Sequence, residues 1–441
     1  MKNRWLYSTV VLALGVNLFL GAQVYVRSAD EAGKNDVYRN LRLFTQVLER
    51  VRQDYVDGAN LTYQDLVYGA LKGMLSTLDP HSEFLDPRKY GDFKDDTEGA
   101  YGGVGLQINV VGDFLTVVGV MEDSPSSRVG IRSGQRIVRI NDRDAAGMAA
   151  ADAVVLLRGV PGTEVRMTVE RPDDGARQEH TLKREIIKIE TVTDLAGGRD
   201  FKLGEDRIGY VRLAQFGERT AGELETAIQR LEAQGMVGLV VDLRNNPGGL
   251  LDQAAKVCSL FLEPKRLVVT TEGRDPAEHR EFRVPTRGSH YEFPLAVLVN
   301  EGSASASEIV AGCMQDWERA VVVGERTFGK GSVQSVIEIQ DGAALRLTTA
   351  RYYTPKRRII HEQGITPDIL ASLTPEEERA LDLQRSPGML ATLSPTEREE
   401  VLAVRDEPLE RARDLLKGMA LFAQRHGKLA KASKVPSLPR N

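Results

Sequence analysis

The chain has 441 residues, of which 41% are hydrophobic and 27% are charged, and its formal net charge is -5. One hydrophobic core rarely serves a chain of this length, so the sequence predicts several folded regions. The mildly acidic balance lacks the basic excess of nucleic-acid-binding proteins, so we expect no nucleic-acid partner, and two cysteines are too few for a disulfide framework.

The N-terminus carries an uncharged run over residues 5–26, preceded by Lys2 and Arg4. This run is long enough to cross a bilayer, which takes about 20 residues, and its basic flank predicts a cytoplasmic N-terminus. Residues 1–27 are therefore predicted to be a membrane anchor or a signal peptide. We favour an uncleaved anchor, because cleaved signal peptides have a shorter apolar stretch and residues 20–22 make a weak cleavage site.

Residues 28–98 predict a helical region. Apolar side chains recur at helical spacing through residues 36–55, which predicts a helix with one buried face. A second helix with inward apolar side chains is predicted over residues 63–75, and Asp79-Pro80 ends it. The residues expected to be buried are Val37, Leu41, Phe44, Leu48, Val51 and Tyr55 in the first helix and Val67, Leu71, Met74 and Leu75 in the second.

Residues 99–188 change to short strands separated by turns. Residues 103–110 and 114–120 are predicted to form two strands joined at Gly112-Asp113, and residues 149–157 a helix. More strands follow, at residues 165–169 and 179–182. We expect a compact β-rich domain here.

Residues 189–371 alternate between apolar strands and helices, which is typical of an α/β domain whose sheet is covered on both faces. Cys258 and Cys313 fall in this region and are predicted to be buried thiols rather than a disulfide. Strands are predicted at residues 208–213, 237–243, 295–300, 320–323, 332–339 and 344–349, and helices at 220–234, 250–261 and 303–316.

Residues 372–441 are rich in Glu, Arg and Leu and predict a helical C-terminal region. Amphipathic helices are expected over residues 375–383 and 395–422. The basic stretch 428–441 is predicted to be a disordered tail, and contact with a membrane surface is the alternative.

Three turns of the α/β region could carry chemistry. Residues 300–309 place Ser303, Ser305 and Ser307 before a helix, whose first amides can point at a nucleophile; a plain helix cap is the alternative. In residues 324–334, Lys330 stands between two glycines, and this enclosure would desolvate its amine and favour the neutral form that a general base requires. In residues 242–249, a pair of glycines could present amides to an oxyanion, although an ordinary turn has the same pattern.

Other chemistries fit the sequence poorly. The stretch from Gly324 to Lys330 partly matches a phosphate-binding loop, but Gly331 replaces the metal-binding Ser or Thr, and a strand rather than a helix is predicted to follow. The sequence contains neither a G-x-S-x-G elbow nor an H-E-x-x-H metal motif. A serine activated by a lysine needs neither a histidine nor a metal.

Together these segments resemble the C-terminal processing peptidases, also called tail-specific proteases. The similarity rests on Ser305-Ala306-Ser307-Glu308-Ile309, on the run from Arg319 to Gln334, and on the turn 242–249. Residues 102–106 and 124–141 also resemble a PDZ domain. The resemblance implies a multidomain α/β fold: a crotonase-like (ββα) protease core with an inserted PDZ-like β-rich domain and helical N- and C-terminal segments.

The resemblance also implies roles for individual residues. Ser305 would be the nucleophile, Lys330 the general base, and Gln334 the residue that holds the lysine amine. Ser303 and Ser307 are alternatives to Ser305, which the spacing to the lysine selects, and Asp316 would be an auxiliary residue in some members. The amides of Ala306 and of Gly248 or Gly249 would form the oxyanion hole, and those of Val104, Gly105 and Leu106 would bind a substrate carboxylate.

These roles lead to a functional prediction: a serine endopeptidase that binds substrate C-termini through its PDZ domain and cleaves them through a Ser-Lys dyad and an acyl-enzyme, without a cofactor. Flexible or unfolded protein tails are the expected partners, with the membrane and a second copy of the chain as further ones. The expected location is the cell envelope, anchored in the inner membrane with the catalytic part in the periplasm or otherwise outside the cytoplasm. The alternative is a catalytically silent PDZ scaffold that binds peptides.

Overall fold

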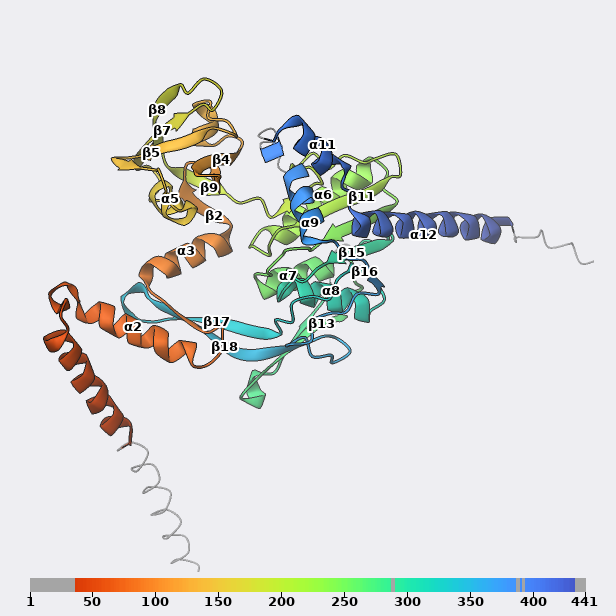
Figure 1. Ribbon diagram of the computed structural model, residues 1–441. Helices are drawn as coiled ribbons and strands as arrows, with labels where there is room; N and C mark the ends of the chain where they lie inside the picture. Colours follow the sequence, from red (N-terminus) through yellow and green to blue (C-terminus); the bar gives the residue numbers. More distant parts are fainter. Residues whose placement is uncertain (1–35, 287–289, 386–388, 391–392, 433–441) are drawn as a thin grey trace, which may run out of the picture. The chain divides into compact units, whose positions relative to one another are not determined.

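The computed structural model describes residues 36–286, 290–385, 389–390 and 393–432 (Figure 1). The chain divides into two compact units, Met1–Phe84 and Leu85–Asn441. The predicted anchor, residues 1–27, lies outside the described residues. None of the helices in the described part of the chain has the length and apolar character that a membrane span requires.

The first unit contains a helix over residues 36–54, the 3-10 turn η1 (Gly58–Asn60) and α2 (Tyr63–Ser76). The Thr62 side chain accepts a hydrogen bond from the Asp65 amide at 3.0 Å, and the Asp65 carboxylate accepts one from the Thr62 amide at 3.1 Å, so a capping box starts α2. Both predicted helices therefore exist, within one residue of the expected ends.

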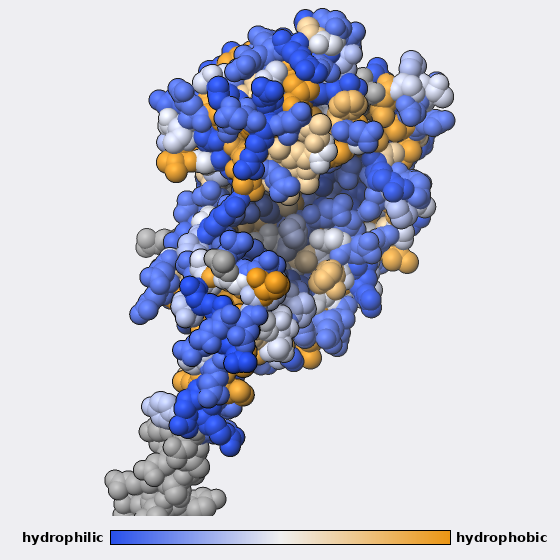
Figure 2. Space-filling view, turned by 60° about the vertical axis from the view of Figure 1, so that its left-hand side comes forward, coloured by the Kyte–Doolittle hydropathy of each residue, from blue (hydrophilic) through white to orange (hydrophobic). Residues whose placement is uncertain are grey.

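The burial predicted for the first helix is wrong. Its apolar face is exposed: Val37 and Leu41 keep 57% and 55% of their surface, and Met74 of α2 keeps 56%. Helical spacing identifies a face but not a partner for it, and the described residues of this small unit offer too little surface to cover it. Figure 2 shows apolar and polar residues mixed along the segment that leads into the grey N-terminal residues.

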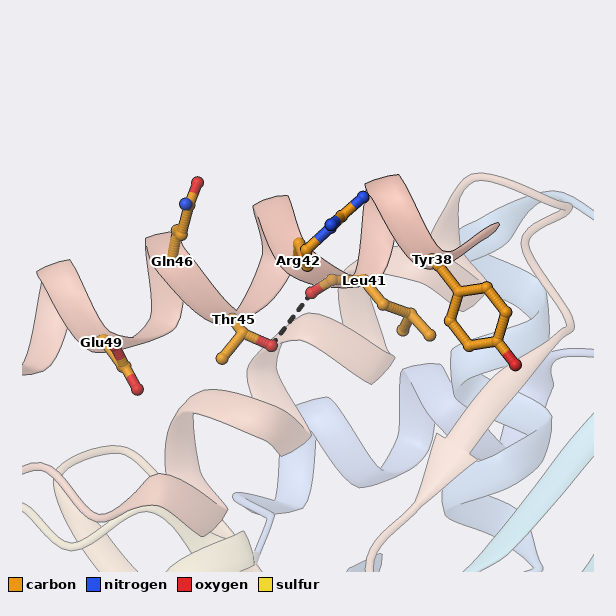
Figure 3. A pocket seen from close by; sticks show the side chains of 6 residues that line it. All are labelled: Tyr38, Leu41, Arg42, Thr45, Gln46 and Glu49. Atoms are coloured by element: carbon orange, nitrogen blue, oxygen red, sulfur yellow. Dashed lines mark hydrogen bonds between the residues drawn. The ribbon is translucent and has the colours of Figure 1, made fainter. Parts of the chain in front are cut away.

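A close view of the same helix shows a shallow hollow lined by six of its own residues (Figure 3). Tyr38, Leu41 and Thr45 project to one side, whereas Arg42 and Gln46 project to the other. The Thr45 hydroxyl donates to the Leu41 carbonyl at 3.0 Å, which satisfies this polar group within the helix. The side that carries Leu41 also carries Tyr38 and Glu49.

The second unit begins with α3 (Pro87–Glu98), which Asp86 caps by accepting from the Lys89 amide, and continues into the predicted β-rich domain. Its main sheet has the order β3-β4-β5-β7-β8, with β6 beside β5, and β2 pairs separately with β9. The elements are β2 (Ala100–Gly103), β3 (Leu106–Val111), β4 (Phe114–Val120), α4 (Pro125–Arg128), β5 (Arg136–Ile140), β6 (Arg143–Asp144), α5 (Ala150–Leu157), β7 (Glu164–Glu170), β8 (Arg177–Lys183) and β9 (Glu185–Lys188). Their inward side chains form one apolar core, as predicted.

A six-stranded sheet with the order β10-β11-β12-β15-β16-β19 forms the centre of the α/β domain. Its strands from β11 to β19 are parallel, and every residue of β12 and β15 is buried because both faces are covered. The strands are β10 (Val192–Thr193), β11 (Ile208–Leu213), β12 (Gly238–Asp242), β15 (Leu295–Val299), β16 (Val321–Gly324) and β19 (Ile369–Leu370).

Helices α6 (Thr220–Ala233), α7 (Leu251–Ser259) and α8 (Ala306–Asp316) cover one face of this sheet, and their core holds Cys258 and Cys313 as free, buried thiols. The other face is covered by α12 (Glu407–Ala432), whose Leu409, Ala412 and Leu416 are buried against the strands (Figure 1). The C-terminal region is thus part of the folded domain.

The C-terminal helices differ from the prediction in two respects. The single helix expected over residues 395–422 is two helices, α11 (Pro395–Ala403) and α12, preceded by α9 (Pro375–Gln384). Pro408 has no amide hydrogen, so it is tolerated in the first turn of α12 but would break a continuing helix. Residues 428–432 of the stretch predicted as disordered are the last residues of α12, so that part of the prediction is wrong. Residues 433–441 lie outside the described residues.

A second sheet is antiparallel and contains β13, β14, β17 and β18. β17 follows Lys330 directly, so the predicted strand after the lysine is confirmed and the helix of a phosphate-binding loop is absent there. The remaining elements are β1 (Glu83–Leu85), β13 (Leu267–Gly273), η2 (Pro276–Glu278), β14 (Arg280–Arg283), β17 (Ser332–Glu338), η3 (Gln340–Gly342) and β18 (Ala344–Tyr353).

Candidate active site

Ser305 lies at the turn between β15 and α8, as the N-cap residue of the helix. Its backbone has φ 56° and ψ −112°, a region that residues with a side chain rarely adopt, and only 6% of its surface is exposed. Such strained positions persist when the surrounding structure enforces them, and they cluster at active sites. The backbone geometry thus marks Ser305 as a candidate nucleophile.

The two neighbouring serines have structural roles. The Ser303 hydroxyl donates to the Leu243 carbonyl at 2.7 Å and accepts from the Asn300 amide at 3.0 Å. The Ser307 hydroxyl donates to the Asn246 carbonyl at 2.9 Å. Both residues are fully buried, so their hydroxyls hold the turns together.

Glu308 joins the serine turn to the lysine loop. One carboxylate oxygen, Oε2, accepts from the amides of Ser305 and Lys330 at 2.8 and 2.9 Å. The other, Oε1, accepts from the Thr327 hydroxyl at 2.5 Å and the Gly329 amide at 2.7 Å. The backbones of Ser305 and Lys330 therefore meet at one oxygen atom.

The Glu308 carboxyl is fully buried, and burial raises its pKa, against the opposing effect of its four hydrogen bonds. Glu308 belongs to the serine motif, but no role was predicted for it from the sequence. A signal was available, because a glutamate three residues after a serine N-cap is the pattern of a capping box.

Lys330 is half-buried between two glycines that the loop requires. Gly329 has φ +94°, and a Cβ at Gly331 would lie 2.2 Å from the His361 backbone nitrogen. The loop is held further by the Phe328 amide, which donates to the Ser303 carbonyl at 3.0 Å. The predicted enclosure of the lysine by close backbone packing is thus present.

Gln334 lies on β17, in the strand that leads away from Lys330. Its side-chain nitrogen donates to the Ser332 hydroxyl at 2.8 Å and to the Thr348 hydroxyl of β18 at 3.4 Å. These contacts fix the Gln334 side chain on the antiparallel sheet. The predicted contact between Gln334 and the lysine amine stays a prediction.

The glycine turn after β12 packs directly against Ser305. Gly248 has φ +102°, and a Cβ there would lie 2.8 Å from the Ser305 Cβ and 3.0 Å from the Ala306 nitrogen. Gly249 has φ +143° and packs as closely on the Phe216 carbonyl. Both positions require glycine, and the turn brings Gly248 beside Ala306, as the oxyanion-hole prediction requires. The Gly248 amide itself donates to the Asn246 side chain at 2.9 Å.

Tyr352 of β18 is a second residue that sequence reasoning missed. Its side chain is almost fully buried, and its hydroxyl interacts with the Ser305 side chain. Burial raises the pKa of Tyr352, and the contact with Ser305 opposes this shift. The contact depends on how β18 folds back over the Lys330 loop, where the Tyr352 amide donates to the Gly331 carbonyl at 2.8 Å. Sequence spacing alone contains no signal for it.

Comparison with known proteins matches residues 207–371 to peptidase family S41 and residues 116–171 to the PDZ domain. A carboxy-terminal-processing protease of Bartonella bacilliformis is 38% identical over 379 residues, which cover 85% of each chain. The chain belongs to the carboxy-terminal-processing protease family. It is therefore a serine-type peptidase with a PDZ domain, as the sequence motifs predicted.

Other members of the family agree with this assignment. The carboxy-terminal processing protease CtpA of Bacillus subtilis is 31% identical over 366 residues, covering 83% of this chain and 76% of that protein. A solved structure of an S41 protease from Bacteroides fragilis has a TM-score of 0.50 at 16% identity, covering 85% of this chain and 97% of that one. The solved structure shows that the fold is shared, as predicted for a protease core with a PDZ insertion.

The PDZ domain of this family member carries a groove between β3 and α5. The groove is lined by apolar side chains and by the loop that the sequence predicted as the carboxylate-binding segment. In that loop Gly105 has φ +75°, and a Cβ there would lie 2.2 Å from the Ser124 Cβ, so only glycine fits. The lining includes Val104, Gly105, Leu106, Ile108, Val154 and Leu157.

Asp316, predicted as an auxiliary residue in some members, holds a turn remote from the serine hydroxyl. Its carboxylate pairs with Arg358 at 2.5 Å and accepts from the Lys356 amide at 2.8 Å. These contacts show that the buried Asp316 carboxylate stabilises the turn at residues 354–358. Among the described residues, no group of three or more His, Cys, Asp or Glu side chains is arranged to hold a metal ion.

We predict that Glu308→Gln lowers kcat for peptide hydrolysis on the order of 100-fold with little change in KM, because an amide cannot accept from four donors and both loops shift. The raised pKa of Glu308 means that its carboxylate, the form that accepts these bonds, protonates at a higher pH than an ordinary glutamate. The wild-type enzyme should therefore lose activity on acidification through this step, and the variant should lack it.

The matched control for this experiment is Glu318→Gln, which removes an exposed carboxylate just beyond the end of α8. Its kcat should equal that of the wild type. An unchanged kcat in Glu308→Gln, or an equal loss in both variants, would contradict the role assigned to the buried carboxylate.

Proposed function

We propose that this protein is a serine endopeptidase in which Ser305 is the nucleophile and Lys330 the general base. The observation that carries the proposal is the shared Glu308 oxygen, which brings the Ser305 and Lys330 backbones together. The strained backbone of Ser305 and the structural use of Ser303 and Ser307 support the choice of serine.

In the proposed reaction, neutral Lys330 takes the hydroxyl proton of Ser305, and Oγ attacks the scissile carbonyl carbon. The tetrahedral intermediate collapses when the C–N bond breaks and the lysine returns the proton to the leaving amine. Water, deprotonated by the same lysine, then attacks the acyl carbon. The C–Oγ bond breaks, the second product leaves, and the lysine returns the proton to Ser305. Gln334 is proposed to orient the lysine amine through its side-chain oxygen.

The amides of Ala306 and of Gly248 or Gly249 are proposed to stabilise the oxyanion. Ala306 is the first residue of α8, where backbone amides lack partners within the helix and the helix dipole favours negative charge. The Gly248 amide would have to leave the Asn246 side chain to take part.

Substrate selection is proposed to begin at the PDZ groove, because PDZ domains bind peptide C-termini. The extended tail would add as a strand beside β3, and its carboxylate would meet the amides of Val104, Gly105 and Leu106. The apolar lining of the groove favours an apolar terminal side chain. Flexible or unfolded tails are the proposed substrates, because they can also reach the active site.

We predict that the purified full chain cleaves a flexible protein with an apolar free C-terminus and spares the same protein amidated at that end. Ser305→Ala should abolish cleavage, with a loss of roughly 10⁶-fold in kcat as for other nucleophilic serines. Ser307→Ala should keep measurable activity, because it removes only a structural hydrogen bond.

Each alternative outcome has a distinct meaning. Equal cleavage of free and amidated substrates would remove tail recognition but keep the peptidase. Tail binding without cleavage by the wild type would favour a catalytically silent PDZ scaffold. Full activity in Ser305→Ala would contradict the assigned nucleophile.

We also propose that residues 1–27 anchor the protein in the inner membrane and leave the peptidase in the periplasm or otherwise outside the cytoplasm. The uncharged run over residues 5–26 and its basic flank support this location. In cells that express the full chain, the protein should stay with membranes in alkaline carbonate, and in spheroplasts made from these cells it should be digested by added protease. Recovery in the soluble fraction at full length would overturn the anchor, and recovery there without residues 1–27 would indicate a cleaved signal peptide.

Self-association into a homodimer is proposed for the exposed face of the first helix. Leu41 and Phe44 keep 55% and 42% of their surface exposed, which is unusual for two large apolar side chains on one helix face. Leu41→Glu should lower the molar mass measured by sedimentation in mild detergent. Gln46→Glu, which adds the same charge on the opposite side, should leave it unchanged (Figure 3). A monomeric wild type would contradict the proposal.

A further inference from the structure

A buried ion cluster connects the glycine turn to the C-terminal helices. Arg244, the second residue after β12, is 5% exposed in its side chain and binds two carboxylates. Its contacts to Asp242 are 2.6–3.1 Å long, and its two terminal nitrogens reach the two oxygens of Asp406 at 2.7 and 2.8 Å. A bidentate contact of this kind fixes both the distance and the orientation of the guanidinium group.

Asp406 lies outside the segment that matches peptidase family S41, in the break between α11 and α12. It accepts from the Leu409 amide at 3.2 Å and so caps α12, and it also binds Arg385 at 3.0 Å. With Asp406 present, two aspartates face two arginines in a site with little water. Without its charge, Arg244 would keep only Asp242, and Arg385 would keep Asp382 at 3.6 Å and Asp242 at 4.0 Å, so a buried guanidinium would lose its bidentate partner, which is costly.

The position of Arg244 is transmitted to the serine turn by short hydrogen bonds. The next residue, Asn245, donates its amide to the Asn300 side chain at 2.8 Å. Asn246 then accepts from the Ala304 amide at 3.0 Å and from Ser307. A rotation of the turn at Arg244 would therefore displace the backbone on both sides of Ser305.

A second contact joins the same two regions. The Asn300 side chain, which binds Asn245 at 2.9 Å, also donates to Glu378 of α9 at 2.9 Å. The C-terminal region thus reaches both turns that flank Ser305, one through Asp406 and the other through Glu378. Neither contact could be expected from the S41-matched segment alone.

We infer that Asp406 is a positioning residue for the peptidase reaction: through Arg244 it holds the glycine turn in the geometry that stabilises the oxyanion. The inference rests on the proposed function of that turn. Burial alone would raise the pKa of Asp242, but the Arg244 guanidinium beside it holds that pKa well below its usual range, so Asp242 stays ionised at neutral pH.

The chain offers a matched control in Asp206, which ties the same helix to the other edge of the sheet. Asp206 binds Arg413 of α12 through two contacts of 2.8 and 2.9 Å and precedes β11, whereas Asp406 lies where β12 ends. The two aspartates have similar exposure, at 13% and 10%. Asp206→Asn therefore loosens α12 without touching Arg244.

The test compares Asp406→Asn, Asp206→Asn and the wild-type full chain in kinetics and in hydrogen exchange of residues 243–250. Asp406→Asn should lower kcat at least 10-fold with KM unchanged and speed exchange in this segment. Asp406→Glu should restore part of kcat, because it keeps the charge. Asp206→Asn should keep both wild-type kcat and wild-type exchange here, even where it lowers the unfolding temperature as much.

Exchange does not depend on catalysis, so the two readouts separate the possible failures. Faster exchange in Asp406→Asn alone, with no cleavage by the wild type, would keep the positioning role and reject the proposed function. Unchanged kcat and exchange in Asp406→Asn, or equal losses in both variants, would overturn the inference and reduce Asp406 to a packing contact.

Discussion

The site depends on one buried carboxylate that receives four hydrogen bonds. Glu308 is fully buried, and three backbone amides and one hydroxyl donate hydrogen bonds to its carboxylate. Hydrogen bonds to charged groups in a buried site are stronger than those at a surface, and leaving one unmade is correspondingly costly. The serine turn and the lysine loop are distant in sequence, and this carboxylate makes their positions depend on each other.

The parallel sheet explains why these turns meet at all. In an open sheet of parallel strands, the loops after the carboxyl ends of the strands gather along one edge. The glycine turn follows β12, the serine turn follows β15 and the lysine loop follows β16, and these three strands are neighbours. The order of strands thus assembles the proposed site, and side chains such as Asn246 and Glu308 then fix its details.

Sequence patterns predicted what local rules determine. Apolar runs identified the buried strands β12 and β15, and glycines at 248, 329 and 331 occur where the backbone packs too closely for a Cβ. Three features could not be predicted in this way. The Tyr352–Ser305 and Arg244–Asp406 contacts join distant segments, so no spacing rule describes them. The apolar face of residues 36–54 has helical periodicity, but most of its large side chains are exposed within the described part of the chain. Pro408 was visible in the sequence and should have divided the C-terminal helix.

The C-terminal region after residue 371 also decides which part of the chain can fold by itself. The match to the peptidase family S41 model ends at residue 371, yet the strands are covered on one face by α12, and Arg244 binds its second carboxylate at residue 406. A fragment cut at the family boundary would expose an apolar sheet face and leave a guanidinium half-neutralised in the interior. The segment that the family model matches is therefore shorter than the unit that buries its own sheet, and a gene fusion or a truncation would have to keep the longer one.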